Sequence, residues 1–249
     1  MNTNNNQHSV IWGSERIDFR LRRSDRRTLG ITVHPDLGVL VMAPRSAAIE
    51  RILGKVGKRA NWIREQQRFF REFLPKMPPR RYVSGETHRY LGRQYRLKVV
   101  EGGEPGVKLK GRFIWISVPQ KSSQGVRRLV ERWYLERAKD RLSRSFDRGL
   151  ERMGKVLAVA PALRIRRMLK RWGSWTRRSG VCLNPELVKA PGSCIDYVVI
   201  HELCHAVHGH HGKEFYDLQR RIMPDWEQRK ARLEQVGAEA GIASEMKTY

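Results

Sequence analysis

The sequence predicts an α+β fold, in which strands and helices form separate groups along the chain. Three observations predict it: period-two alternation near the N-terminus, an apolar helical stripe after it, and further helical sections in the C-terminal half. We expect an N-terminal strand-and-helix region at 11–74, a small β region at 81–120 and a third region at 121–240. Residues 1–10 are polar and asparagine-rich, so a disordered tail is expected there.

The N-terminal region begins with a strand, because Ile17, Phe19 and Leu21 alternate with charged residues. Two more strands are expected at 29–33 and from residue 39, on either side of a turn. Ser46 is a candidate N-cap for the helix that follows. Apolar residues at helical spacing mark that helix: Ile49, Ile52, Leu53, Val56, Ala60, Ile63 and Phe70.

The middle of the chain opens with three prolines within 75–80, which indicate a hinge or connector. Strands are expected at 90–100 and 113–118, separated by the glycine-rich stretch 102–111. Residues from 124 to about 153 have the period of a helix with an arginine-rich outer face. Short strands at 163–167 and 180–183 and two C-terminal helices, the first closed by Pro224, complete the prediction.

The charge of the chain is far from average. Fifty Lys and Arg residues oppose 25 Asp and Glu residues, which gives a formal net charge of +25. Such an excess favours nonspecific binding to nucleic acid through its phosphates, and the alternative is a basic surface that only aids solubility. Runs at 20–27 and 170–178 are the main basic patches, and no aromatic interleaving of the kind used for single-strand stacking is apparent.

Other features of the composition argue against several classes of protein. Three cysteines without a C-x-x-C pattern argue against a disulfide framework and suit a reducing compartment. The N-terminus has no apolar signal core, and no apolar run approaches the length of a membrane span. The glycines match neither a phosphate loop nor a dinucleotide fingerprint. We therefore expect a cytoplasmic protein without a membrane partner, whose oligomeric state the sequence leaves unknown.

The residues that carry chemistry lie at 201–205, which read HELCH. On a helix, residues four apart lie on one face, so His201 and His205 can offer ring nitrogens to one metal ion. Glu202 lies beside them, where it can act on water bound to the ion rather than on the ion itself. This is the H-E-x-x-H pattern.

A third histidine, His211, follows six residues after His205. An unbroken helix would turn it away from the ion, so the helix must stop and the chain must return. Gly209 is expected to end the helix after His208 by adopting a left-handed conformation. His210 is the rival third ligand, and His208 is either a donor to a ligand or an ordinary surface histidine.

Three neutral imidazoles with a position left for water are the ligand set of a catalytic zinc ion, here one per chain, which points to hydrolysis. Glu202 is then the candidate general base. Cys204 is a conceivable thiolate ligand, although a small buried thiol is the alternative. The candidates for stabilising a developing oxyanion are Tyr197, Tyr216 and Arg171.

Three segments make the pattern more specific: RWGSW at 171–175, GVCLNPELVKAP at 180–191 and IDYVVIHELCH at 195–205. Together they resemble the YgjP-like metallopeptidase family. Trp175 stands where that family usually has Cys, and Pro185 where it usually has Trp. The H-x-x-x-G-x-H portion also resembles the WLM and SprT-like proteases, which act on DNA-bound proteins.

The resemblance implies that 121–240 is a small zincin-like metallopeptidase domain in which strands beside the metal helix can bind an extended substrate. It also implies a cytoplasmic zinc-dependent hydrolase. The leading hypothesis is therefore a zinc metallopeptidase that cleaves proteins or peptides, including proteins associated with nucleic acid. Two alternatives remain: a metal-dependent nucleotide or phosphoester hydrolase, and a basic nucleic-acid-binding module with structural zinc.

Overall fold

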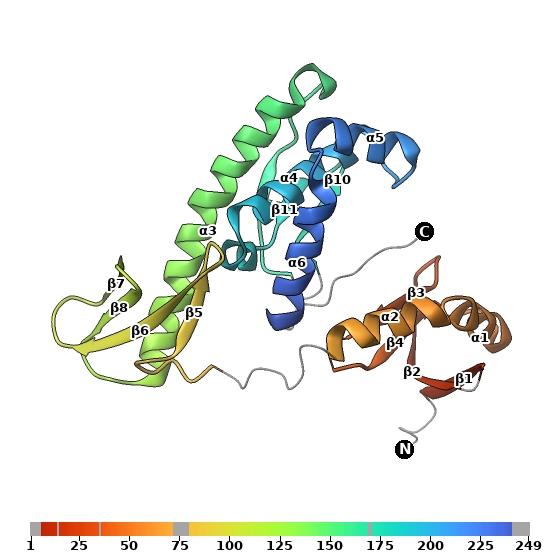
Figure 1. Cartoon of the computed structure of the whole chain (residues 1–249), viewed down its shortest axis with the longest axis horizontal. Helices are drawn as coiled ribbons and strands as arrows, with labels where there is room; N and C mark the ends of the chain where they lie inside the picture. The colour runs from red at the N-terminus through yellow and green to blue at the C-terminus, as the bar shows by residue number, and fades with distance from the viewer. Residues whose placement is uncertain (1–5, 14, 35, 72–79, 169–170, 241–249) are drawn as a thin grey trace. The chain divides into compact units, whose positions relative to one another are not determined.

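The computed structural model of the chain describes residues 6–13, 15–34, 36–71, 80–168 and 171–240 (Figure 1). It has six α-helices and three mixed sheets in these ranges, so the predicted α+β class is confirmed. The chain divides into two compact units, one of residues 1–77 with 237–249 and the other of residues 78–236. Of the proline-rich connector predicted at 75–80, all but Arg80 lies outside the described residues.

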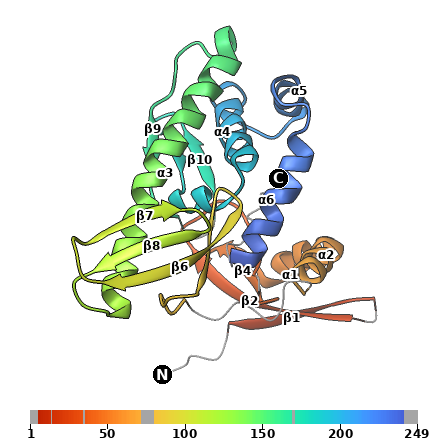
Figure 2. The ribbon, with the colours of Figure 1, turned by 60° about the vertical axis from the view of Figure 1, so that its left-hand side comes forward.

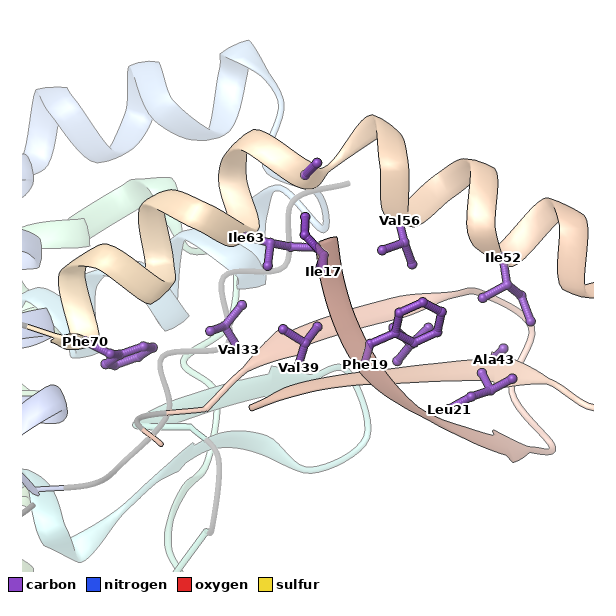
Figure 3. Packing of buried hydrophobic residues seen from close by; sticks show 12 residues of the cluster. Ile17, Phe19, Leu21, Val33, Val39, Ala43, Ile52, Val56, Ile63 and Phe70 are labelled. Atoms are coloured by element: carbon purple, nitrogen blue, oxygen red, sulfur yellow. The ribbon is translucent and has the colours of Figure 1, made fainter. Parts of the chain in front are cut away.

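The first unit contains a four-stranded sheet in the order β1-β2-β4-β3. Its strands are β1 (Gln7–Trp12), β2 (Glu15–Ser24), β3 (Gly30–Val33) and β4 (Val39–Pro44). The β2 strand pairs in parallel with β4, and the other two pairs are antiparallel. The alternation in β2 buries one side only, because Ile17, Phe19 and Leu21 face the helices that cover the sheet (Figure 3).

Three predictions for this unit were wrong. In the tail expected to be disordered at 1–10, residues 7–10 form part of β1 and pair with β2, and residues 1–5 lie outside the described residues. The single helix expected after Ser46 is two helices, α1 (Ile49–Lys58) and α2 (Ala60–Arg71), which meet at Arg59 with φ −108° and ψ 9°. Ala48, which makes no side-chain cap hydrogen bond, occupies the N-cap position in place of Ser46.

The second unit begins with the sheet β5-β6-β8-β7. Its strands are β5 (Thr87–Tyr90), β6 (Arg93–Glu101), β7 (Gly106–Lys110) and β8 (Phe113–Val118). The strand predicted at 90–100 is interrupted by a tight turn at Leu91 and Gly92, which both have positive φ. Gly92 needs this freedom and also lacks space for a side chain, since a Cβ there would lie 2.8 Å from Pro191 Cγ.

The long helix α3 (Ser123–Met153) supports the rest of this unit, and the sheet lies across it (Figure 2). It begins where Ser122 accepts a hydrogen bond from the Gly125 amide, the bond expected of an N-cap. Buried residues from one side of the sheet, among them Leu97, Ile114 and Ile116, form the core between sheet and helix. The predicted helical section from 124 to about 153 is confirmed.

A third, small sheet has the order β10-β11-β9. Its strands are β9 (Leu163–Ile165), β10 (Gly173–Thr176) and β11 (Gly180–Leu183), and β11 leads into the 3₁₀ helix η2 (Pro185–Lys189). A short 3₁₀ turn, η1 (Gly154–Val156), ends α3. The remaining helices are α4 (Gly192–Val207), α5 (Lys213–Ile222) and α6 (Trp226–Ala240).

No helix within the described ranges combines the length and apolarity that a membrane crossing requires.

Candidate metal centre

The helix α4 carries the HELCH sequence and is packed tightly onto α3. Gly149 of α3 makes the close approach possible, because a Cβ there would lie 2.6 Å from Val199 Cγ1. Asp196 fixes the register of the two helices by accepting hydrogen bonds from Ser145 Oγ at 2.5 Å and from Arg148 at 3.0 Å. Asp196 is therefore an anchor between α4 and α3.

The helix α4 ends near the predicted position, but a different residue breaks it. The helix stops at Val207, and His208 takes extended angles, φ −121° and ψ 109°. Gly209 is not in the left-handed region, so its predicted conformation is wrong. The extended His208 and the bends after it turn the chain back before α5 begins, which still returns His211 to the face of α4.

The structure brings His201, His205 and His211 together. One ligand atom from each ring lies within 4.8 Å of the other two, and among the described residues these three histidines form the one group of His, Cys, Asp or Glu with this arrangement. His201 Nε2 and His211 Nε2 are 3.1 Å apart. Nitrogen ligands at about 2.0–2.1 Å from a tetrahedral ion would be separated by about 3.3 Å, so the spacing suits a metal ion.

Gln219 on α5 orients the first of these rings. Its Oε1 accepts a hydrogen bond from His201 Nδ1 at 2.9 Å. A proton on Nδ1 leaves the lone pair of the neutral ring on Nε2, the nitrogen that faces His211. Gln219 is fully buried on the same side of α5 as Phe215, and this buried amide was not predicted from the sequence.

Phe215 packs against all three imidazoles. Its ring centroid lies 5.1 Å from that of His201 and 4.7 Å from those of His205 and His211, and its side chain is fully buried. A rigid aromatic ring in this position limits the rotation of the histidines. The cluster is thus held by packing from α5 as well as by the backbone of α4.

The surroundings of His201 favour the neutral form of its ring. Burial, followed by the proximity of His205 and His211, lowers the pKa of His201 to about 3. At neutral pH this ring is uncharged, which is the form that binds a metal ion.

Glu202 is buried, and its side chain lies against the β10 strand. A Cβ on Gly173 would lie 2.7 Å from Glu202 Oε1 and 2.8 Å from Glu202 Cγ. Only glycine allows β10 to approach the carboxylate so closely. The contact between the glycine of the RWGSW segment and Glu202 was not predicted from the sequence.

Asn184 holds the loop that leads into β10. Its side-chain amide donates to the carbonyls of Met168 at 2.8 Å and Arg171 at 3.0 Å, and its backbone amide donates to Trp172 O at 2.8 Å. Asn184 is completely buried. The asparagine of the GVCLNPEL segment therefore positions the strand that packs on Glu202.

The rival residues lie outside the cluster. His210 is exposed, and His208 Nδ1 lies 3.6 Å from Glu214 Oε2. Cys204 is fully buried, and burial raises the pKa of its thiol to about 12, which disfavours the thiolate that a metal ligand needs. Asp217 is exposed and paired with Arg220, so Gln219, rather than Asp217 or Glu214, orients a histidine of the cluster.

The three candidate oxyanion stabilisers differ in burial and in contact with the histidines. Tyr197 is buried between His201 and Trp226, and burial raises its pKa, with Glu234 and Glu202 adding to the shift. Tyr216 is half-buried and stacks on His211 with ring centroids 6.1 Å apart. Arg171 is exposed. Tyr216 combines contact with the cluster and partial exposure.

Known metallopeptidases are similar to this chain. A family model described as YgjP-like, metallopeptidase domain, matches residues 27–236. Among solved structures, the crystal structure of the metallopeptidase zymogen of Pyrococcus abyssi abylysin is 17% identical, with a TM-score of 0.36. That match covers 41% of this chain and 98% of the other chain. No curated protein sequence matches the chain.

Proposed function

The chain belongs to the YgjP-like metallopeptidase family and is a metal-dependent peptidase, and we propose that it hydrolyses peptide bonds with one zinc ion held by His201, His205 and His211. The observation that carries this proposal is the convergence of the three ring nitrogens within 4.8 Å. Three imidazoles suit zinc better than magnesium or calcium, which prefer oxygen ligands. Three protein ligands also leave a position for water or substrate, as in catalytic rather than structural zinc sites.

When bound, the ion would polarise the scissile carbonyl and lower the pKa of a water molecule toward about 7. Glu202 is the residue proposed to take the proton from the attacking water and to pass it to the leaving amine. Its position supports this role, since it is adjacent to His201 in the chain and buried against Gly173. Tyr216 is the proposed donor to the oxygen on which negative charge develops.

The β10 strand is the proposed place for the substrate backbone. Within the described residues it is an edge strand, since β11 is the only strand paired with it there, and Gly173 at its start adjoins the proposed base. An extended peptide can add to such an edge through main-chain hydrogen bonds. This arrangement would bring a peptide carbonyl toward the histidines without a dedicated side-chain pocket.

The proposed substrates include proteins associated with nucleic acid. The net charge of +25 supports this choice, because a strongly basic enzyme is concentrated near phosphate backbones and whatever is bound to them.

We also propose a cytoplasmic location. All three cysteines are free and buried, which suits a reducing compartment.

The test is hydrolysis of a fluorescently labelled unfolded protein by the zinc-loaded chain and by Glu202→Gln. Loss of the proposed base should lower kcat at least about 100-fold while zinc remains bound. Glu214→Gln is the matched control, because Glu214 is an exposed carboxylate on α5. Equal activity of Glu202→Gln and the native protein would contradict the proposal, and release of phosphate from nucleotides by the native protein would favour the phosphoester alternative.

A further inference from the structure

The β5-β6-β8-β7 sheet has a second side, which faces away from α3. The strand register places eight long side chains on it: Arg89, Gln94, Arg96, Lys98, Lys108, Lys110, Phe113 and Trp115. We call this set the basic sheet face. The opposite side carries the buried residues that pack on α3, among them Leu97, Ile114 and Ile116.

Cations flank an aromatic residue in two successive rows across this face. In one row, Lys98 on β6 and Lys108 on β7 both pair with Trp115 on β8. In the next row, Arg96 and Lys110 both pair with Phe113. The two rows are about 7 Å apart along the strands.

The side chains in these rows remain available to a ligand. The four cations Arg96, Lys98, Lys108 and Lys110 are exposed, and in the part of the chain that the structure describes none of them forms an ion pair with a carboxylate. Phe113 is 39% exposed, which is unusual for a phenylalanine. None of the residues that the strand register places on this face is Asp or Glu.

Two of these cations lie over the ring of Trp115. Lys98 Nζ lies 4.0 Å from its ring centroid and Lys110 Nζ lies 5.6 Å away. The indole Nε1 has no hydrogen-bond partner among the described residues, although the atom is buried. If the two ammonium groups move to an anionic ligand, the aromatic surface and its N–H donor become accessible to that ligand.

We propose that the basic sheet face binds single-stranded nucleic acid. Phosphates would contact the flanking Lys and Arg side chains, and two consecutive bases would stack on Trp115 and Phe113. A duplex fits this face less well, because its bases already stack on one another and offer no free face to Trp115. The inference is independent of peptide hydrolysis and supplies a specific surface for the nucleic-acid association proposed above.

The sequence alone does not reveal this arrangement. Lys98, Lys108 and Trp115 are separated along the chain, and they meet because β6 pairs with β8 in parallel while β7 pairs with β8 antiparallel. The expectation that no aromatic residues interleave with basic ones holds along the chain but not across the sheet.

The test is binding of a fluorescently labelled 12-mer of single-stranded RNA or DNA to the full chain, measured by anisotropy at several salt concentrations. We expect Lys98→Glu/Lys110→Glu to weaken binding at least tenfold and to reduce the slope of log K against log salt by about 1.4, or about 0.7 per lost cation. Trp115→Ala should weaken binding about tenfold, and Trp115→Phe should largely preserve it. Circular dichroism of each variant verifies that it is folded.

The matched control is Lys139→Glu/Lys155→Glu, which changes the net charge equally at exposed positions on α3 and η1. We expect this control to bind within threefold of the native protein, and Glu202→Gln to bind like the native protein even if it is inactive. Equal weakening by both charge reversals would reduce the effect to net charge and overturn the proposal. Tighter binding of duplex than of single strands, or unchanged binding by Trp115→Ala, would also overturn it.

Discussion

Gly173 on β10 lies directly against the carboxylate of Glu202 on α4. A Cβ added to Gly173 would be 2.7 Å from Glu202 Oε1, and 2.8 Å from Val198 Cγ1 on the same helix. These distances are too short for real contacts, so a side chain at 173 must displace the carboxylate or the strand. The position of the proposed base thus depends on a glycine some 30 residues earlier in the chain.

This relationship predicts that Gly173→Ala damages catalysis more than metal binding. We expect kcat to fall about 10- to 100-fold, since a displacement of about 1 Å at a catalytic group has effects of this size. The zinc content should not change, because the atoms nearest to a Cβ at 173 belong to Glu202 and Val198 rather than to a histidine. Gly192→Ala is the control, since nothing lies within 4 Å of a Cβ at that position. Full activity in Gly173→Ala would show that the close approach has no role in catalysis.

A second prediction concerns the ring that Gln219 orients. Gln219→Leu removes the acceptor for His201 Nδ1, which frees the ring to rotate or to change tautomer. We expect the Kd for zinc, measured by competition with a chelator, to rise about 10- to 100-fold. Asp217→Asn, at an exposed position on the same helix, should leave the Kd unchanged. An unaltered Kd in Gln219→Leu would mean that the hydrogen bond does not support metal binding.

A third prediction separates Cys204 from the ligands. Because this thiol is buried and its pKa is raised to about 12, Cys204→Ala should keep the zinc content of the native protein. Alkylating reagents should modify Cys204 only after unfolding. Mass spectrometry of alkylated protein and elemental analysis of the variant provide the two measurements. Loss of zinc from Cys204→Ala would make the thiol a ligand after all.

A fourth prediction concerns pH and His88, which is buried beside a cavity of about 350 Å³ lined also by Arg80, Tyr134 and Lys189. Burial, and then Arg80, lower the pKa of His88 from 6.5 to about 4. Between these values the unfolded chain binds more protons, so the free energy of unfolding rises with pH. The stabilisation is complete above pH 6.5 and is lost as the pH falls toward 4.

Urea unfolding of the native protein and of His88→Gln between pH 7.5 and 4 tests this dependence. The native protein should lose on the order of 2 kcal/mol more than the variant across that range. Parallel pH profiles for the two proteins would contradict the assignment to His88.

Much of the fold could be predicted from local pattern. The strands of the first sheet that alternate cleanly, such as β2, and the helices with a strong apolar stripe, such as α3 and α5, follow directly from residue periodicity. The pattern failed where tertiary pairing decides the structure. The β1 strand begins within the polar N-terminal stretch but pairs with β2, and β7 lies in a glycine-rich stretch that antiparallel pairing with β8 makes extended.

The same distinction between local pattern and tertiary contact applies to the candidate site. The convergence of His201, His205 and His211 could be anticipated from spacing, although the conformation of Gly209 was wrong because His208 makes the break instead. Gln219 and Gly173 could not be anticipated, since each acts through a contact between separate elements. Metal binding itself stays a prediction.

Elemental analysis of zinc content per chain determines whether these histidines hold a metal ion, when it is applied to the native protein and to alanine variants of His201, His205, His210 and His211. We expect about one zinc ion in the native protein and in His210→Ala, and loss of zinc in the other three variants, each of which should remain folded by circular dichroism. Native protein that holds no metal when prepared without chelator, and takes up none when zinc is added, would contradict the account of this site.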